Sequence, residues 1–215
     1  MGIQDQSESF SKDKLHHARN VAMEICYELS SLIKPGMTEE DAHRLYKEVC
    51  QKKGITKQWH PPKLRFGPNT TLTFKEPSAP YILQENDVYF LDIGPVVDGY
   101  EADYGEPFYV GSDYEHRKIC AAAQEVFRLT AETFRKEKLT GPELYQMAKK
   151  YAHDKGYELR LDSDGHRVGE FPHHIIFKGS LLDCEETVVP DAWILEIHLF
   201  HPKEKYAAFF EDILI

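Results

Sequence analysis

The chain has 215 residues, of which 36 are acidic and 26 basic, giving a formal net charge of −10. This length suits one domain with a substantial core, and 41% hydrophobic residues exclude wholesale disorder. An acidic surface repels phosphate backbones, so nucleic acid is not an expected partner. We also expect no membrane span, because no apolar run approaches the length required. The four cysteines are widely separated, which argues against a disulfide framework and favours a cytoplasmic protein.

The N-terminal part of the chain is predicted to be helical. We expect a polar tail over residues 1–10 and a single domain over residues 11–215. Within residues 15–33, apolar side chains recur every three or four positions, which is typical of an amphipathic helix. A second helix ends at Gly54 and is opened by a Thr-x-x-Asp pattern that resembles a capping box. The proline-rich segment 60–69 is predicted to be a loop.

The rest of the chain is predicted to form strands, two more helices and further strands. Apolar runs at 88–94 and 100–110 flank Asp98-Gly99, the strongest short-range signal for a β-hairpin. One helix starts near Tyr114, and another follows Thr140. The later strands are predicted at 157–161, 175–177, 193–200 and 206–215. Because the order helix, helix, strands occurs twice, the pattern suggests two structurally similar halves.

Asp92 interrupts an apolar run, VYFLDIG, that otherwise predicts a buried strand. An unpaired carboxylate in such a place must be neutralised, paired or bound to a metal. A two-residue turn at Asp98-Gly99 would pair Asp92 with Gly105. Asp103 would then lie one diagonal step away on the same face, about 7 to 8 Å distant, and the two carboxylates would repel each other without a cation. A bulge at Gly94-Pro95 would change this register, and the alternative is a pair of satisfied surface aspartates beside a turn.

Two glutamates raise the same question in the last two predicted strands. Glu196 lies within WILEIHLF and Glu211 within AAFFEDIL. Each could instead point outward from a half-exposed strand, the commoner place for a lone glutamate. The presence of four acidic residues in apolar strands favours metal binding. Carboxylate oxygens with one imidazole suit manganese, iron, cobalt or zinc, and two divalent cations would balance four carboxylates and acidify a bridging water.

These residues resemble the motifs of the family that includes methionine aminopeptidases, Xaa-Pro aminopeptidases and prolidases. Asp92 and Asp103 are separated by eleven positions, as in the family. The sequence Asp-Gly-His-Arg-Val-Gly around His166 is similar to its Gly-His-Gly-Ile-Gly motif, and His173 matches its second histidine. Glu211, which is followed by aspartate, is closest to the Xaa-Pro branch. The resemblance covers nearly the whole chain.

The resemblance implies a fold, a cofactor and a set of residue roles. The fold is the pita-bread α+β fold, in which a curved antiparallel sheet is backed by helices with pseudo-twofold symmetry. The cofactor is a pair of divalent metal ions, with manganese expected and cobalt, iron or zinc as alternatives. The implied ligands are Asp92 for one ion, Asp103 and Glu211 for both, and His166 with Glu196 for the second. Glu196 would also move protons, and His173 would hydrogen-bond the substrate carbonyl or the tetrahedral intermediate.

Three pocket positions depart from the family pattern and are predicted to contact the substrate. Phe74 stands where methionine aminopeptidases carry a histidine, so that contact is lost or is supplied by another residue such as His60. Arg167 replaces a glycine after the metal histidine, which adds bulk and charge. Phe209 stands where relatives usually place Gln or Arg. These changes spare the metal ligands and alter the pocket around them.

Three functions remain open at the level of sequence. The first is a metallopeptidase-family hydrolase, an aminopeptidase that cleaves short peptides through a metal-bridging hydroxide. The second is a creatinase-like hydrolase or lyase acting on a small non-peptide molecule, which the altered pocket favours over a standard methionine aminopeptidase. The third is a non-catalytic binding module, although such relatives usually lose several ligands. We expect a small peptide or small molecule as the partner, with a homodimer as an option.

Overall fold

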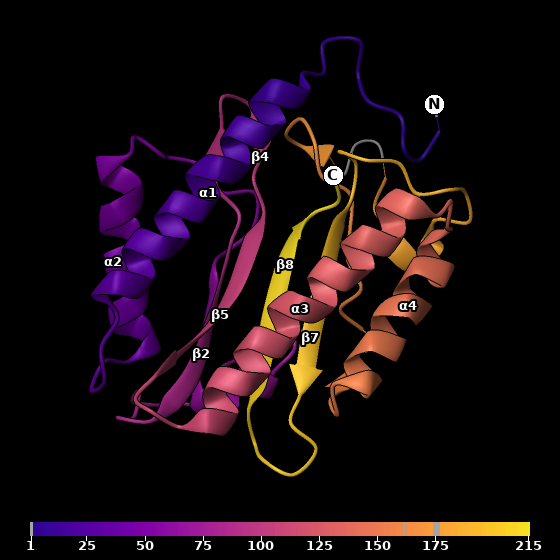
Figure 1. Ribbon diagram of the computed structural model, residues 1–215. Coiled ribbons are helices and arrows are strands. Elements are labelled where there is room, and N and C mark those ends of the chain that lie inside the picture. Colours follow the sequence, from indigo (N-terminus) through magenta and orange to yellow (C-terminus); the bar gives the residue numbers. More distant parts are fainter. Residues whose placement is uncertain (1, 161, 174–176) are drawn as a thin grey trace.

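A computed structural model of the chain shows a six-stranded antiparallel sheet with helices packed against one face, and a small two-stranded ribbon (Figure 1). The structure describes residues 2–160, 162–173 and 177–215. The helices are α1 (Lys12–Leu32), α2 (Glu39–Lys52), α3 (Tyr114–Lys136) and α4 (Gly141–Asp154), with short 3-10 turns at Gly67–Thr71 and Leu181–Asp183. The strands are β1 (Lys63–Phe66), β2 (Asp87–Ile93), β3 (Val96–Val97), β4 (Tyr100–Glu101), β5 (Tyr104–Val110), β6 (Glu158–Leu159), β7 (Ile194–Phe200) and β8 (Ala207–Ile213).

The strand order of the sheet is mirrored about its centre. The six strands run in the order β1-β2-β5-β8-β7-β6, and every described pairing is antiparallel. The first three strands come from the first half of the chain and the last three from the second. Figure 1 shows α1 lying across the first group and α3 across the second, with α2 and α4 on the outside. This arrangement agrees with the predicted α+β class and with two similar halves.

The hairpin predicted around Asp98-Gly99 is present, with the predicted register. Asp98 and Gly99 both have positive φ, at 50° and 84°, which matches the right-handed twist of a two-residue hairpin turn. Val97 pairs with Tyr100 in the small β3–β4 ribbon. Further along, Asp92 pairs with Gly105, so the segment at Gly94-Pro95 does not shift the register.

The predicted helices are confirmed, and their ends follow from capping chemistry. The Thr38 side chain accepts a hydrogen bond from the Asp41 backbone, and the Asp41 carboxylate accepts one from the Thr38 backbone. An equivalent capping box formed by Thr140 and Glu143 opens α4. α3 begins at Tyr114, and the Asp113 side chain accepts from the first free backbone N–H groups.

The segment 60–69, predicted to be a loop, contains the edge strand β1, and this prediction was wrong for residues 63–66. Pro61-Pro62 precede the strand, so their missing N–H groups cost the sheet no ladder hydrogen bond. Leu64 and Phe66 are buried in the core, which stabilises the strand. This edge brings the loop before it next to the end of β2.

Other expectations are confirmed in shortened form or lie outside the described residues. The strand predicted at 157–161 is limited to β6, and residue 161 is not among those described. Of the strand predicted at 175–177, only Phe177 is described, and it is not in a strand. The N-terminal segment makes contacts with the domain, because the Gln4 side-chain oxygen accepts hydrogen bonds from Trp193 Nε1 at 2.8 Å and Val189 N at 3.0 Å.

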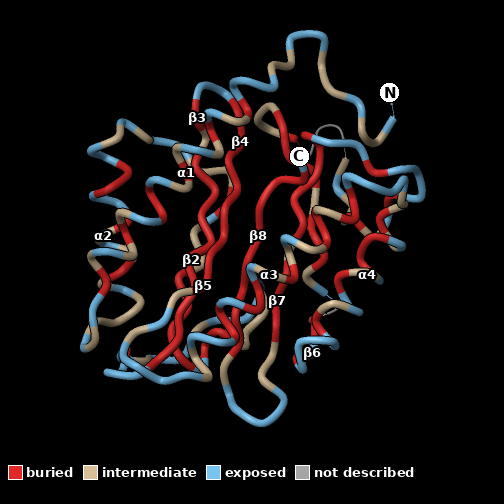
Figure 2. Tube along the Cα trace, viewed as in Figure 1, coloured by how far each residue is buried: buried red, intermediate tan, exposed pale blue. Residues whose placement is uncertain are grey.

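Burial is concentrated in the central strands and the inner faces of the helices (Figure 2). All seven residues of β2 and of β8 are buried. The helix-facing side chains of these strands form the core with residues such as Leu29 of α1 and Val126 of α3. The opposite face of the same strands carries the charged residues discussed next. Within the described parts of the chain, no helix is both long and apolar enough to cross a membrane.

Candidate metal centre

Three carboxylates lie in one line across four strands of the sheet. Asp92 of β2 pairs with Gly105 of β5, Gly105 pairs with Glu211 of β8, and Glu211 pairs with Glu196 of β7. Paired residues project from the same face of a sheet, so we call these residues the carboxylate row. A Cβ atom on Gly105 would lie 2.9 Å from Cγ of Glu211. The glycine therefore makes room for the carboxylate of the neighbouring strand.

Asp103 and His166 complete the group from the two sides. Asp103 lies two residues before Gly105, and His166 lies in the connection between β6 and β7. His166 Nε2 is 2.8 Å from Oδ2 of Asp103 and 3.9 Å from Oε1 of Glu196. The connection approaches β7 closely at Gly165, where φ is 121° and a Cβ atom would lie 2.0 Å from the carbonyl oxygen of Ile194.

The pKa values in this group show that the carboxylates compete for a limited positive charge. Burial raises the pKa of Glu211 well above its usual range, and the charges of Asp103 and Asp92 raise it further. Burial also raises the pKa of Asp92 to about 6 and that of Glu196 to about 7. Burial alone would raise the pKa of Asp103 as well, but the hydrogen bond from His166 and the nearby His60 imidazole outweigh it and lower that pKa. The group can be fully ionised only if additional cations enter.

The donor set fits divalent metal ions. Ligand atoms of Asp103, His166 and Glu211 lie within 4.8 Å of one another, as do those of His60, Asp92 and Asp103. One of these buried atoms, Oε1 of Glu211, has no hydrogen-bond partner among the described residues. An orphaned carboxylate oxygen is costly in a buried site unless a cation binds it. Nδ1 of His166 is 2.7 Å from the Arg167 carbonyl oxygen, which orients Nε2 for a metal.

His173 lies beside the same group and is held by a buried glutamate. Its backbone N–H donates to Oε1 of Glu101 at 3.0 Å, and its Nδ1 is hydrogen-bonded to Oε2 of the same carboxylate. The rings of His173 and His166 are stacked, with their centroids 5.6 Å apart. The Trp59 ring contacts both histidines. The sequence had predicted His173, but it gave no indication that Glu101 would orient it.

A cavity of about 510 Å³ opens over the carboxylate row, within the range of small-ligand sites. Its lining includes Asp92, Asp103, His166, His173, Glu196 and Glu211 together with Trp59, His60, Phe74, Phe90, His198 and Phe209. Phe90, Phe209 and His198 each lie two positions from a member of the carboxylate row, so we call them the aromatic row. Phe209 pairs with His198 and its ring centroid is 5.1 Å from that of Phe90.

Of the three residues predicted to contact the substrate, Phe74 and Phe209 line the cavity and Arg167 does not. Phe209 is buried in the aromatic row. Phe74 is half exposed at the cavity, and its ring centroid is 6.0 Å from that of His60. Arg167 is not among the described residues that line the cavity. Its guanidinium donates to the carbonyl oxygens of Ala192 and Asp5, each at 3.0 Å. The structure thus gives Arg167 a role in holding the N-terminal segment.

The model of metallopeptidase family M24 matches residues 13–215 of this chain. The chain belongs to this family. Among curated relatives, the methionine aminopeptidase of Clostridium acetobutylicum is 24% identical over 170 residues, covering 74% of this chain and 66% of the relative. The M24 chain thus spans slightly less than two thirds of that protein.

Solved structures show the same fold. The Xaa-Pro dipeptidase of Bacillus anthracis superimposes with a TM-score of 0.81 at 21% sequence identity. The superposition covers 99% of the present chain and 60% of the dipeptidase chain. The X-Pro aminopeptidase of Thermotoga maritima gives a TM-score of 0.79 at 18% identity, over 97% and 58%. The predicted family and the predicted pita-bread α+β fold are therefore confirmed.

Proposed function

We propose that this M24 chain is a dinuclear metal-dependent aminopeptidase or dipeptidase that cleaves short peptides. The observation that carries the proposal is the carboxylate row with its unpartnered oxygen on Glu211, at the base of a cavity of about 510 Å³. This cavity has room for a few amino-acid residues. Membership of the metallopeptidase family supports peptide hydrolysis as the reaction class.

The ligand roles in this proposal are those that the family resemblance implies. Asp92 would bind one ion, Asp103 and Glu211 would hold both, and His166 and Glu196 would bind the second. Manganese is the metal we propose, with cobalt, iron and zinc compatible with the same donors. When bound, such ions supply Lewis acidity that polarises a carbonyl and makes water a better nucleophile near neutral pH.

The chain itself would supply proton transfer and orientation. Glu196 is the proposed proton carrier between the attacking water and the leaving amine. Its carboxylate accepts a hydrogen bond from the Ser163 hydroxyl, which fixes its orientation at the cavity. His173, held at Nδ1 by Glu101, is proposed to hydrogen-bond the substrate carbonyl. Phe74 and Phe209 would form apolar walls for a side chain of the substrate.

The aromatic row favours one alternative function. Phe209 is buried against Phe90 and His198, so this side of the cavity offers apolar surface where relatives usually have a polar side chain. Such a wall would also suit a creatinase-like hydrolase or a lyase that acts on a small non-peptide molecule. The full set of five ligands gives less support to a non-catalytic binding module.

A metal-supplemented peptide screen tests the proposal. The protein is treated with chelator, reloaded with Mn²⁺ or Co²⁺, and assayed against dipeptides and tripeptides that include N-terminal Met and Xaa-Pro members. We expect cleavage that requires metal and disappears in Asp103→Ala. Cleavage that persists in Asp103→Ala would contradict the proposal. Turnover of small amides or lyase substrates with no peptide cleavage would support the alternative.

A further inference from the structure

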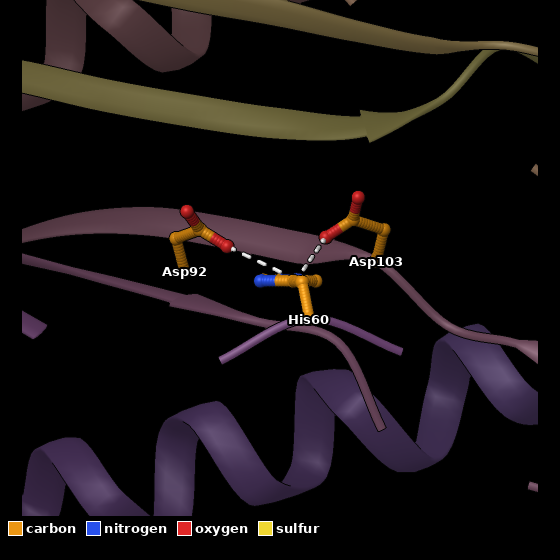
Figure 3. A group of neighbouring side chains, drawn as sticks. All are labelled: His60, Asp92 and Asp103. Atoms are coloured by element: carbon orange, nitrogen blue, oxygen red, sulfur yellow. Dashed lines mark hydrogen bonds and ion pairs between the residues drawn. The ribbon is translucent and has the colours of Figure 1, made fainter. Parts of the chain in front are cut away.

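A second histidine, outside the family's ligand set, lies among the carboxylates. His60 belongs to the loop between α2 and β1 and is 7% exposed. Its Nε2 atom is 3.5 Å from Oδ1 of Asp92 and 3.4 Å from Oδ1 of Asp103. Figure 3 shows the imidazole directed between these two carboxylates. The three side chains therefore converge on one point.

The distances between these atoms match a shared metal better than direct hydrogen bonds. N–H···O hydrogen bonds are usually 2.7 to 3.2 Å long, so separations of 3.4 and 3.5 Å are long for such bonds. Two ligand atoms that each lie about 2.1 Å from a tetrahedral ion are about 3.4 Å apart. His60 Nε2 thus lies from each carboxylate oxygen at the spacing of two ligands that share a cation, and the ligand atoms of all three residues lie within 4.8 Å of one another.

The orientation of the His60 ring is also that of a metal ligand. Its Nδ1 atom is 3.0 Å from the Pro61 carbonyl oxygen, an acceptor, so Nδ1 carries a proton and Nε2 is the nitrogen left to bind a cation between the carboxylates. His166 makes the same contact, with Nδ1 2.7 Å from the Arg167 carbonyl oxygen. The two histidines face opposite oxygens of Asp103, with His60 near Oδ1 and His166 near Oδ2.

The backbone around His60 is shaped to hold it in place. A Cβ atom on Gly94 would lie 2.1 Å from Cδ2 and 2.3 Å from Nε2 of His60, so only glycine at the end of β2 leaves room for the ring. The neighbouring Trp59 is tied to the same strand end, because its backbone N–H donates to the Gly94 carbonyl oxygen at 2.9 Å. Trp59 Nε1 donates to the Ala102 carbonyl oxygen at 3.0 Å.

We propose that His60 is a sixth protein ligand, which binds the ion held by Asp92 and Asp103. Each of the two ions would then have one histidine, His60 for the first and His166 for the second. The inference rests on the metal centre of the proposed function, but not on the substrate or the reaction.

Paramagnetic proton NMR of the cobalt-loaded protein tests the assignment directly. A histidine bound to Co²⁺ through Nε2 shows a strongly shifted, solvent-exchangeable Nδ1 proton. We expect two such resonances in the wild type, one from His60 and one from His166. His60→Ala and His60→Gln should keep only the His166 resonance, and His166→Ala should keep only the His60 resonance. We also expect both His60 variants to weaken binding of one ion, measured by calorimetry, by at least about 10-fold, the smallest loss typical of removing even a residue that orients a ligand.

Phe74→Ala is the matched control, because Phe74 contacts the His60 ring but offers no ligand atom. We expect it to keep both resonances and wild-type metal affinity. Circular dichroism of the chelated variants checks that each has folded, and His60→Gln retains bulk if His60→Ala does not fold. Two resonances and unchanged metal affinity in a folded His60 variant would overturn the assignment of His60 as a ligand but leave the proposed function standing. A change in KM with no change in metal binding would have the same consequence. A wild type that binds no metal would overturn the proposed function as well.

Discussion

Two adjacent rows on the same face of the sheet have opposite chemistry. The carboxylate row crosses the strands at Asp92, Gly105, Glu211 and Glu196, and the aromatic row lies two positions along the same strands. The register of β2 with β5 and of β7 with β8 is continuous through both rows, so the contrast in chemistry comes from the side chains. One row concentrates negative charge that needs cations, and the other supplies an apolar wall. We expect substitutions of the carboxylates in the first row to weaken metal binding and substitutions in the second to change substrate preference only.

Glu211→Gln should produce the largest effect. The change keeps the size of the side chain but removes the charge that is proposed to hold both ions. We expect at most one tightly bound ion and a loss in kcat/KM of at least about 10³-fold, equivalent to about 4 kcal/mol. The metal-free variant should be more stable than the metal-free wild type, because a buried unpaired carboxylate is destabilising. Metal analysis, peptide kinetics and thermal unfolding in chelator measure the three outcomes.

A Glu211→Gln protein that keeps two ions and wild-type activity would break the contrast between the rows. The control is Phe209→Leu, two positions away on the same strand, which should keep both ions.

The metal-free protein should lose stability as pH rises. The pKa of Asp92 is raised from 3.8 to about 6 and that of Glu196 from 4.5 to about 7, so their contribution to the free energy of unfolding is present near pH 4 and lost by about pH 7. Burial lowers the pKa of His166, but the Asp103 carboxylate outweighs burial and raises this pKa from 6.5 to about 9. The contribution of His166 to the free energy of unfolding is therefore lost as the pH rises from about 6.5 to about 9. Asp103, with a lowered pKa, stays ionised above about pH 5 in both states and adds no slope there.

A tenfold difference between the acid dissociation constants of the folded and unfolded states corresponds to about 1.4 kcal/mol of stability. Urea unfolding in chelator at pH 5, 7 and 9 should therefore show a steady decrease, which Mn²⁺ should reverse because metal binding displaces the protons. A metal-free protein whose stability is flat or increases over this range would contradict the electrostatic description of the carboxylate row.

Glu101→Gln should have an intermediate effect that separates orientation from metal binding. The amide weakens the contact that holds His173, so we expect kcat to fall by about 10-fold to 100-fold, as is typical for a residue that positions another. Metal affinity should stay within about twofold of the wild type because Glu101 contacts none of the proposed ligands. Loss of metal in this variant would show that Glu101 supports the metal centre instead.

The smallest effect is expected in the aromatic row. Phe209→Leu removes aromatic surface from the cavity wall without adding a polar group. Relative kcat/KM for substrates with large and small apolar side chains should change by about 10-fold at most, the lower end of the range for a change in a hydrophobic pocket. A panel of matched dipeptides measures this ratio. Equal losses for all substrates would place Phe209 with the metal-holding residues.

The turn sequence predicted the pairing of Asp92 with Gly105, and the family resemblance singled out Glu196 and Glu211, but neither predicted the loops that face the carboxylate row. Asp98-Gly99 fixes the turn, the turn fixes the register, and the register pairs Asp92 with Gly105. By contrast, His60 and Glu101 reach their places through contacts between segments distant in sequence, and no periodicity marks such contacts. The strand β1 was missed because adjacent prolines favour a loop, although Leu64 and Phe66 gain more by burial in the core.

Arg167 shows a different limit. Its position after the metal histidine suggested a substrate contact, but the alternation of side chains along an extended segment directs neighbours to opposite sides. His166 therefore faces the carboxylates, while Arg167 packs over the Trp193 ring, with 5.7 Å between the guanidinium carbon and the ring centroid.

Anomalous diffraction from crystals grown with Mn²⁺ tests the dinuclear metal centre most directly. Data collected at the manganese absorption edge locate the ions and identify their ligands without reference to any substrate. We predict two anomalous peaks over the carboxylate row, both bound by Asp103 and Glu211. A fully supplemented crystal with no peak there, or with manganese bound only at the protein surface, would contradict the account.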